Sequence, residues 1–135
     1  MVMNSQGIAG ETAAQYWFRA HDWYMSRHQP PTKVIGRGTS KRVIYSDTGG
    51  IADYTGHEYV ELHDGRALPL FRACEVKESR GDRMPCSRLG RKQRAYMDSL
   101  PNGCAWVGIL WTGTGTFEMY HYQQTGSYTR GEGMV

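Results

Sequence analysis

Residues 71–79 read FRACEVKES and place a carboxylate, Glu75, two positions before an ammonium group, Lys77. The apolar residues around this pair predict a buried strand. Because side chains two residues apart in a strand point to the same face, we expect Glu75 and Lys77 side by side, with Cys74 and Val76 facing the opposite way. Most isolated E-x-K pairs are simple ion pairs at a sheet edge, so the rest of the chain must supply any further meaning.

Several strands are predicted around this segment. Asp64-Gly65 separates two apolar-rich runs and indicates a β-hairpin, whose second strand covers about residues 66–77. Downstream, CAWVGILW (104–111) is typical of a buried strand, TGTG of a turn and TFEMYHY (116–122) of another strand. Upstream, RVIY (42–45) predicts a strand, and IADYTG (51–56) is a short apolar run that ends in a turn.

Two helices are predicted. Apolar residues at helical spacing indicate a helix from about residue 8 to 27, ended by the prolines of RHQPP. RLGRKQRAYMDSL (88–100) predicts a second helix, with Ser87 as its N-cap. The polar tail from Gln123 onward is expected to be loose. The four tryptophans fall in apolar periodic segments, which favours a place in the core: Trp17, Trp23, Trp106 and Trp111.

Composition limits the classes of protein that fit. The 135 residues suggest one domain, 1–135, and 39% hydrophobic with 12% aromatic residues is typical of a folded globule. The sequence shows neither a membrane-spanning apolar run nor a signal pattern, so we expect a cytoplasmic protein. Three scattered cysteines and five histidines without compact spacing favour reduced thiols over a zinc site.

Positive charge is concentrated in two segments although the net charge is only +3. Residues 72–94 contain eight Lys or Arg and three acids, which gives 8 − 3 = +5, and residues 27–42 contain five basic residues and no acid. Such clusters are typical of a face that binds a polyanion, or of a solvated surface. A role in phosphate contact predicts affinity that falls steeply with salt. The candidates for DNA contact are Arg37, Lys41, Arg42, Arg80, Arg83, Arg88, Arg91 and Lys92.

Asp53 gives the Glu75–Lys77 pair a chemical context. It lies at the end of the short apolar run in IADYTG, where it could also simply cap the following turn. Mg²⁺ binds through one or two carboxylates together with waters and phosphate oxygens, so Asp53 and Glu75 at neighbouring strand ends would form a credible site. Lys77 beside them could orient an attacking water or offset charge that develops on a phosphate.

The order Asp53, Glu75-Val76-Lys77 and then Gln93 in RLGRKQRAYM resembles the PD-(D/E)xK nuclease superfamily. Within it, residues 7–122 are most similar to the Holliday junction resolvases of the RecU and archaeal Hjc type. Ala52 stands where the motif that names the superfamily has proline, and the spacing from Asp53 to Glu75 is longer than in most members. The resemblance implies an α/β (α+β) domain with a restriction-endonuclease-like core: a central mixed sheet flanked by helices.

The resemblance also implies roles for individual residues. Asp53 and Glu75 would bind Mg²⁺, which Mn²⁺ could replace, with the Val76 carbonyl and Glu11 of the opening helix as further ligands. Lys77 would orient the water for in-line attack that leaves 5′-phosphate and 3′-hydroxyl ends. Gln93 would hold the water network or a phosphate. The resemblance implies DNA as the partner, with the four-way junction as the first candidate. It also implies a homodimer in a bacterial, archaeal or phage-infected cell.

Other interpretations stay open. A restriction-like or phage recombination nuclease would act on duplex or flap DNA, and a module that lost catalysis would only bind nucleic acid. An unrelated basic α/β protein is a further alternative. Glu11 could be an ordinary glutamate of a first helical turn, and Gln93 a plain surface residue. The compact size favours recognition of DNA shape over recognition of its sequence.

Overall fold

A five-stranded mixed sheet forms the centre of the protein in a computed structural model that describes residues 6–28, 32–35, 38, 42–45 and 51–135. The strand order is β1-β4-β5-β7-β8; β5 and β7 run parallel, and the other neighbours run antiparallel. The strands of this sheet are β1 (Trp23–Arg27), β4 (Tyr54–Glu61), β5 (Ala67–Ser79), β7 (Ala105–Trp111) and β8 (Thr116–His121).

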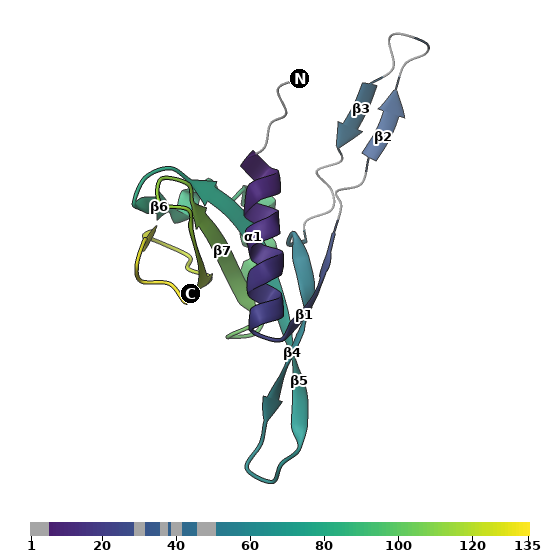
Figure 1. Ribbon diagram of the computed structural model, residues 1–135. Helices are drawn as coiled ribbons and strands as arrows, with labels where there is room; N and C mark the ends of the chain where they lie inside the picture. The colour runs from purple at the N-terminus through teal and green to yellow at the C-terminus, as the bar shows by residue number, and fades with distance from the viewer. Residues whose placement is uncertain (1–5, 29–31, 36–37, 39–41, 46–50) are drawn as a thin grey trace.

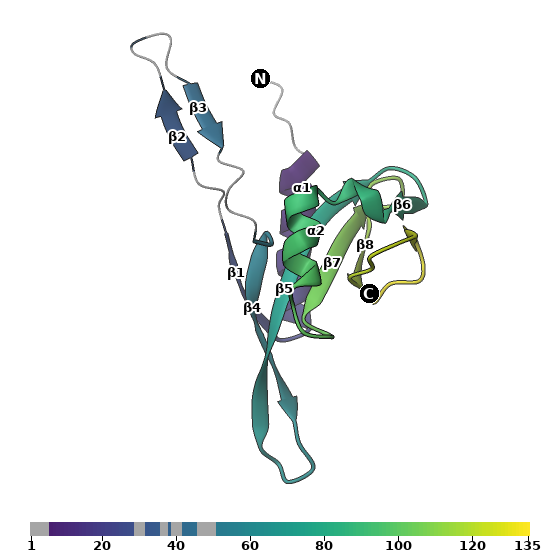
Figure 2. The same ribbon diagram turned by 180° about the vertical axis from the view of Figure 1, so that it is seen from behind.

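Helix α1 (Gln6–Ala20) covers one face of the sheet and helix α2 (Arg91–Asp98) the other (Figures 1 and 2). The predicted α+β class, a mixed sheet flanked by helices, is therefore confirmed. Two small antiparallel ladders complete the described fold, and one of them contains the predicted strand at 42–45. These remaining elements are β2 (Thr32–Ile35) with β3 (Arg42–Tyr45), β6 (Arg83–Pro85) with β9 (Ser127–Thr129), and the short 3₁₀ helix η3 (Cys86–Arg88).

The first helix is shorter than the predicted 8–27. Asp22 has a φ of 57°, a left-handed conformation that a helix cannot continue through. The next five residues form β1, which pairs with β4 from Trp23 opposite Glu58 to Arg27 opposite Tyr54. The apolar spacing of this segment suited a helix, but pairing with a strand about thirty residues later in the chain decided its conformation.

The predicted hairpin is confirmed, with Gly65 in the left-handed conformation at its tip. Its first strand begins earlier than the apolar pattern indicated, at Tyr54, so the IADYTG turn is partly strand. β4 and β5 pair from Tyr54 opposite Cys74 to Glu61 opposite Ala67. The outer part of this hairpin extends beyond the rest of the sheet as a two-stranded arm (Figure 1).

All four tryptophans are buried, as predicted. Trp17 of α1 packs with Trp23, Trp106 and Cys74 of β5 in one cluster. Trp111 packs in a second cluster with residues of β6, β7 and β9. A smaller third cluster joins Ala52, Ala73 and Met97 and fixes α2 against the sheet. The central strand β5 is thus held from both sides, which makes it a rigid support for the side chains it carries.

The C-terminal tail is packed, so the prediction of a loose segment from Gln123 is wrong. Strand β9 pairs with β6, and Tyr128 is fully buried. The backbone N–H and C=O groups of Met134 bond to those of Met119 in β8 at 2.8 Å. These partners lie far away in sequence, and a polar, glycine-containing tail gives no local sign of such non-local pairing.

The start of the second helix also differs from the prediction. Helix α2 begins at Arg91 rather than at 88, and Gly90 is its N-cap. Ser87, the predicted cap, lies in the 3₁₀ helix η3. The Gly90 N–H donates to Gln93 Oε1 at 2.8 Å, which is the glutamine half of a capping box; glycine has no side chain to accept the reciprocal bond from the helix.

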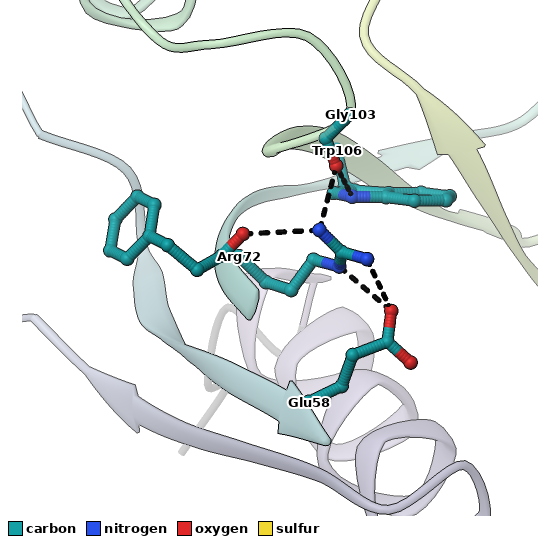
Figure 3. A network of polar contacts seen from close by, with 5 residues as sticks. Glu58, Arg72, Gly103 and Trp106 are labelled. Carbon is teal, nitrogen blue, oxygen red and sulfur yellow. Dashed lines mark hydrogen bonds and ion pairs between the residues drawn. The ribbon is translucent and has the colours of Figure 1, made fainter. Parts of the chain in front are cut away.

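A buried arginine ties the base of the arm to the core (Figure 3). Arg72 donates from Nε and Nη2 to Glu58 Oε1, at 2.8 and 2.6 Å, and from Nη1 to the Gly103 carbonyl at 3.0 Å. Its guanidinium carbon lies 5.6 Å from the ring centroid of Trp23 and 5.7 Å from that of Trp106. The guanidinium is thus hydrogen-bonded within its plane and covered by aromatic rings, a geometry suited to arginine.

Candidate active site

The alternation of side chains along β5 separates two environments, as predicted. Cys74 and Val76 pack with the cluster beneath α1. Ala73 lies on the other face against Met97 of α2, and Glu75 follows it two residues later on the same face. Lys77 continues this row, so a carboxylate and an ammonium group lie on the α2 face of the central strand.

Asp53 and Glu75 are brought together although 22 residues separate them. Asp53 lies just before β4, opposite Glu75 in the extension of the β4–β5 register. The Asp53 N–H donates to Glu75 Oε1 at 3.0 Å, and the Val76 N–H donates to Asp53 Oδ2 at 2.9 Å. Each main chain therefore orients the carboxyl group that the other strand contributes.

Glu75 is the most unusual group of the site. It is 1% exposed, and among the described residues no hydrogen-bond donor reaches its Oε2. Burial and then the nearby Asp53 carboxylate raise the Glu75 pKa, the Lys77 ammonium lowers it, and together they bring it to about 8. At neutral pH the carboxyl group thus retains a proton unless a cation takes that place. A buried acid with one unsatisfied oxygen is costly for stability, which is typical of functional sites.

Glu11 lies in α1 but forms an ion pair with Arg27 of β1. Arg27 Nε and Nη2 lie 3.0 and 2.8 Å from Glu11 Oε1. Among the described residues, no group of three or more His, Cys, Asp or Glu side chains is placed to hold a metal ion. The structure therefore brings two of the predicted acids together, whereas Glu11 pairs with Arg27. The sequence analysis did not predict this partner at the end of β1.

Gln93 has a structural role in the described fold. Its Oε1 accepts the hydrogen bond from Gly90 that caps α2. The sequence predicts that the Gln93 side chain holds the water network or a phosphate, or that Gln93 is a plain surface residue. In the structure its amide oxygen instead stabilises the end of the helix. The Val76 backbone is next to both acids through its N–H. The role of the Val76 carbonyl as a metal ligand stays a prediction.

A cleft of about 740 Å³ lies at the end of β5, bounded by Lys77, Arg80 and Arg88 together with α1 and β7. Neither Asp53 nor Glu75 is among the described residues that line it. Arg88 is oriented by a bond of 2.9 Å from Nη1 to the Glu78 carbonyl. Three cations border this hollow, an environment suited to phosphate, together with the Glu78 carboxylate and residues of α1 on the face of β5 opposite to Glu75.

The other predicted DNA-binding residues are mostly on the surface. Arg83, Arg91 and Lys92 are exposed, like Arg80 and Arg88. Arg42 lies in β3, where only the backbone is described, and Arg37 and Lys41 fall outside the described residues.

Glu78 is a feature that the sequence analysis missed. Its Oε2 is buried without a hydrogen-bond partner among the described residues, and its side chain borders the cleft. It lies 3.0 Å, measured from Cγ, from the place a Cβ would take on Gly10 of α1. The signal was available in EVKES, where a second glutamate follows Lys77, but alternation places it on the face opposite to Glu75.

No family model matches the chain, and no curated protein matches it significantly. In the parts of the chain that the structure describes, no helix has the length and apolar character needed to cross a membrane.

Proposed function

We propose that the protein is a divalent-metal-dependent endonuclease that hydrolyses phosphodiesters in branched DNA, with the four-way junction as its first candidate substrate. The observation that carries this proposal is the buried Asp53–Glu75 pair, with one glutamate oxygen that lacks a donor and Lys77 on the same face. This set fits Mg²⁺, which takes one or two carboxylates and completes its coordination with water and phosphate oxygens. The resemblance to the PD-(D/E)xK nucleases supports the same interpretation.

Each residue has a distinct task in this proposal. Asp53 and Glu75 would hold the metal, and their orientation is fixed in advance by the two backbone N–H groups that bind them. When bound, Mg²⁺ supplies positive charge that stabilises the charge developing on the phosphate. Lys77 orients the attacking water and adds a second positive charge on the same face. Arg80 and Arg88 at the cleft bind neighbouring phosphates.

The main competing proposal is a protein that binds nucleic acid without cutting it. Such a protein would gain nothing from a buried acid pair, which lowers stability and repels phosphate when ionised. Retention of Asp53, Glu75 and Lys77 on one face therefore favours the enzyme. A homodimer would place two such sites on a symmetric junction.

A direct assay tests the proposal. The protein is incubated with labelled four-way junction, 5′ flap and linear duplex DNA, with Mg²⁺ or with chelator. We expect symmetric nicking of the junction with Mg²⁺ and no product with chelator, and Asp53→Asn should be inactive. Cleavage restricted to duplex or flap would assign a different substrate, and no cleavage of any DNA with Mg²⁺ or Mn²⁺ would refute the nuclease.

Lys77→Ala should lower kcat by about 10²–10³-fold, because it removes a positioned cation from the transition state. Binding of Mg²⁺ should weaken much less, since the two carboxylates remain. Single-turnover cleavage of junction DNA measures the first effect and calorimetric Mg²⁺ titration the second. Arg130→Ala, an exposed cation after β9, is the matched control and should cleave like the wild type. Equal rates for Lys77→Ala and wild type would remove Lys77 from the mechanism.

Mg²⁺ binding should depend on pH. Because the Glu75 pKa is raised to about 8, binding at pH 7 must displace a proton, so affinity should rise about 10-fold per pH unit until pH 8 and then level off. Calorimetry in two buffers of different ionisation enthalpy counts the released proton. Glu75→Gln should release none. A wild-type affinity that is flat from pH 6 to 8 would contradict the assignment of Glu75 as a ligand.

A further inference from the structure

An exposed aromatic cluster lies at the base of the β4–β5 arm and on β1. Tyr24 and Tyr59 are 57% and 55% exposed, Phe71 is 42% exposed, and His57 lies among them. The His57 ring is stacked on Tyr24 with centroids 5.4 Å apart, and Tyr59 contacts both rings edge-on at 5.9 and 5.0 Å. Large aromatic rings left in water on one sheet face are a feature that the core does not explain.

This cluster shares a face with the acid pair. Tyr24, His57 and Phe71 are in register across β1, β4 and β5. Phe71 and Glu75 are four residues apart on β5, so they point to the same side, as do His57 and Asp53 along the other strand. At about 3.4 Å per residue, His57 is about 14 Å from Asp53 and Tyr59 about 20 Å.

Polar residues of β1 and β4 lie between the two places. Ala73 lies between Phe71 and Glu75 but is covered by Met97 of α2, which closes the direct route along β5. On the neighbouring strands, Ser26 and Thr55 are paired in register, and Ser26 is exposed. A strand bound at the acid pair would reach the rings over these residues of β1 and β4.

We propose that Tyr24, His57, Tyr59 and Phe71 form a stacking platform for the unpaired bases of a nucleic-acid strand that enters the acid site. This rests on the proposed nuclease function and narrows its substrate class to DNA with single-stranded nucleotides a few positions from the scissile phosphate. Every base offers a π-face, so stacking on aromatic side chains binds single strands without regard to sequence. Paired bases in a duplex cannot reach such rings.

The two faces of the arm expose different kinds of side chain. On the face opposite to the acid pair the exposed large side chains are aliphatic, Leu68 and Leu70, at 46% and 38%. The same two strands thus present aliphatic groups on one side and rings with polar edges on the side of the acid pair. Exposed rings on the same face as the acid pair offer planar bases a stacking surface that the aliphatic face does not.

Binding of fluorescein-labelled dT12 in chelator, followed by anisotropy, tests the platform without any need for cleavage. Tyr24→Ala combined with Tyr59→Ala should weaken binding about 10-fold or more, since each stacked base contributes appreciably. Tyr24→Phe with Tyr59→Phe should stay within about 3-fold, because the ring faces remain. Leu68→Ala with Leu70→Ala, the matched pair on the opposite face, should bind like the wild type.

Three outcomes would overturn the platform: unchanged dT12 binding by the double alanine variant, an equal loss in the leucine pair, or dissociation of a dimer by the tyrosine substitutions. Tyr24→Leu with Tyr59→Leu retains apolar area and controls for folding, and it should also lose binding. Failure of the platform proposal can be distinguished from failure of the nuclease proposal. Ring-dependent dT12 binding without any metal-dependent cleavage would refute the enzyme alone, and cleavage by Glu75 without ring-dependent binding would refute the platform alone.

Discussion

Glu75→Gln is expected to reduce metal-dependent cleavage of junction DNA by at least about 10³-fold, because several kcal/mol of transition-state stabilisation depend on the metal. The amide keeps the size of the side chain but cannot carry the negative charge that a cation requires. Single-turnover cleavage with saturating Mg²⁺ measures the loss. A variant with more than a tenth of the wild-type rate would show that Glu75 is not a ligand.

The same substitution should stabilise the metal-free protein at pH 8. The folded-state pKa of Glu75 is raised to about 8 from its ordinary value of 4.5, so its stabilising contribution is complete below pH 4.5 and is lost as the pH rises through 8. Glu75→Gln removes that loss, and its free energy of unfolding in chelator should exceed that of the wild type by a few kcal/mol at pH 8. Urea denaturation at pH 5 and pH 8 measures the difference.

Glu118 provides the matched control for both measurements. It is also buried, at 3% exposure, but its carboxylate accepts hydrogen bonds from the Tyr120 hydroxyl and the Gly131 N–H. Glu118→Gln should therefore lower stability at pH 8 by about 1–3 kcal/mol, because satisfied charged bonds are lost. Stabilisation by both substitutions would mean that burial alone, and not the unsatisfied oxygen, governs the response.

Arg72→Ala should lower the free energy of unfolding by about 3–5 kcal/mol, since it leaves Glu58 and the Gly103 carbonyl without their donor and uncovers Trp23 and Trp106. Urea denaturation at pH 7 measures the change. Arg66→Ala breaks an ion pair of the same length, 2.6 Å to Asp64, but at the exposed tip of the arm. It should cost less than about 1 kcal/mol. Similar losses for both variants would refute a special role for the aromatic surroundings of Arg72.

The parts of the fold that the sequence predicted correctly depend on local signals. The Asp64-Gly65 turn, the alternation in FRACEVKES and the apolar run 104–111 each specify their conformation within a few residues. The meeting of Asp53 with Glu75 was inferred from their positions at neighbouring strand ends and from the resemblance, and the hairpin register gives it a physical cause. Antiparallel pairing of Tyr54 with Cys74 necessarily sets the preceding residue beside the following one.

The parts that were missed depend on distant partners. Trp23 joins a strand because β4 offers it an edge, and Tyr128 is buried because β6 passes beside β9. Glu11 forms an ion pair with Arg27 and does not join the acid pair, and Gln93 accepts a hydrogen bond from the backbone of Gly90. Each of these side chains has a good local reason to adopt several roles, and the tertiary contact selects one of them.

The single uninterrupted strand β5 restricts how natural variants of this protein can differ. Its residues Ala67–Ser79 run from the arm to the acid site, and each added or deleted residue would exchange the two faces beyond it. Evolution can therefore lengthen or shorten the arm at the tip, around residues 62–66, or by even numbers of residues on both strands. An odd change within β5 would move the carboxylate of Glu75 beneath α1, and a lineage that acquired it would lose the acid pair in one step.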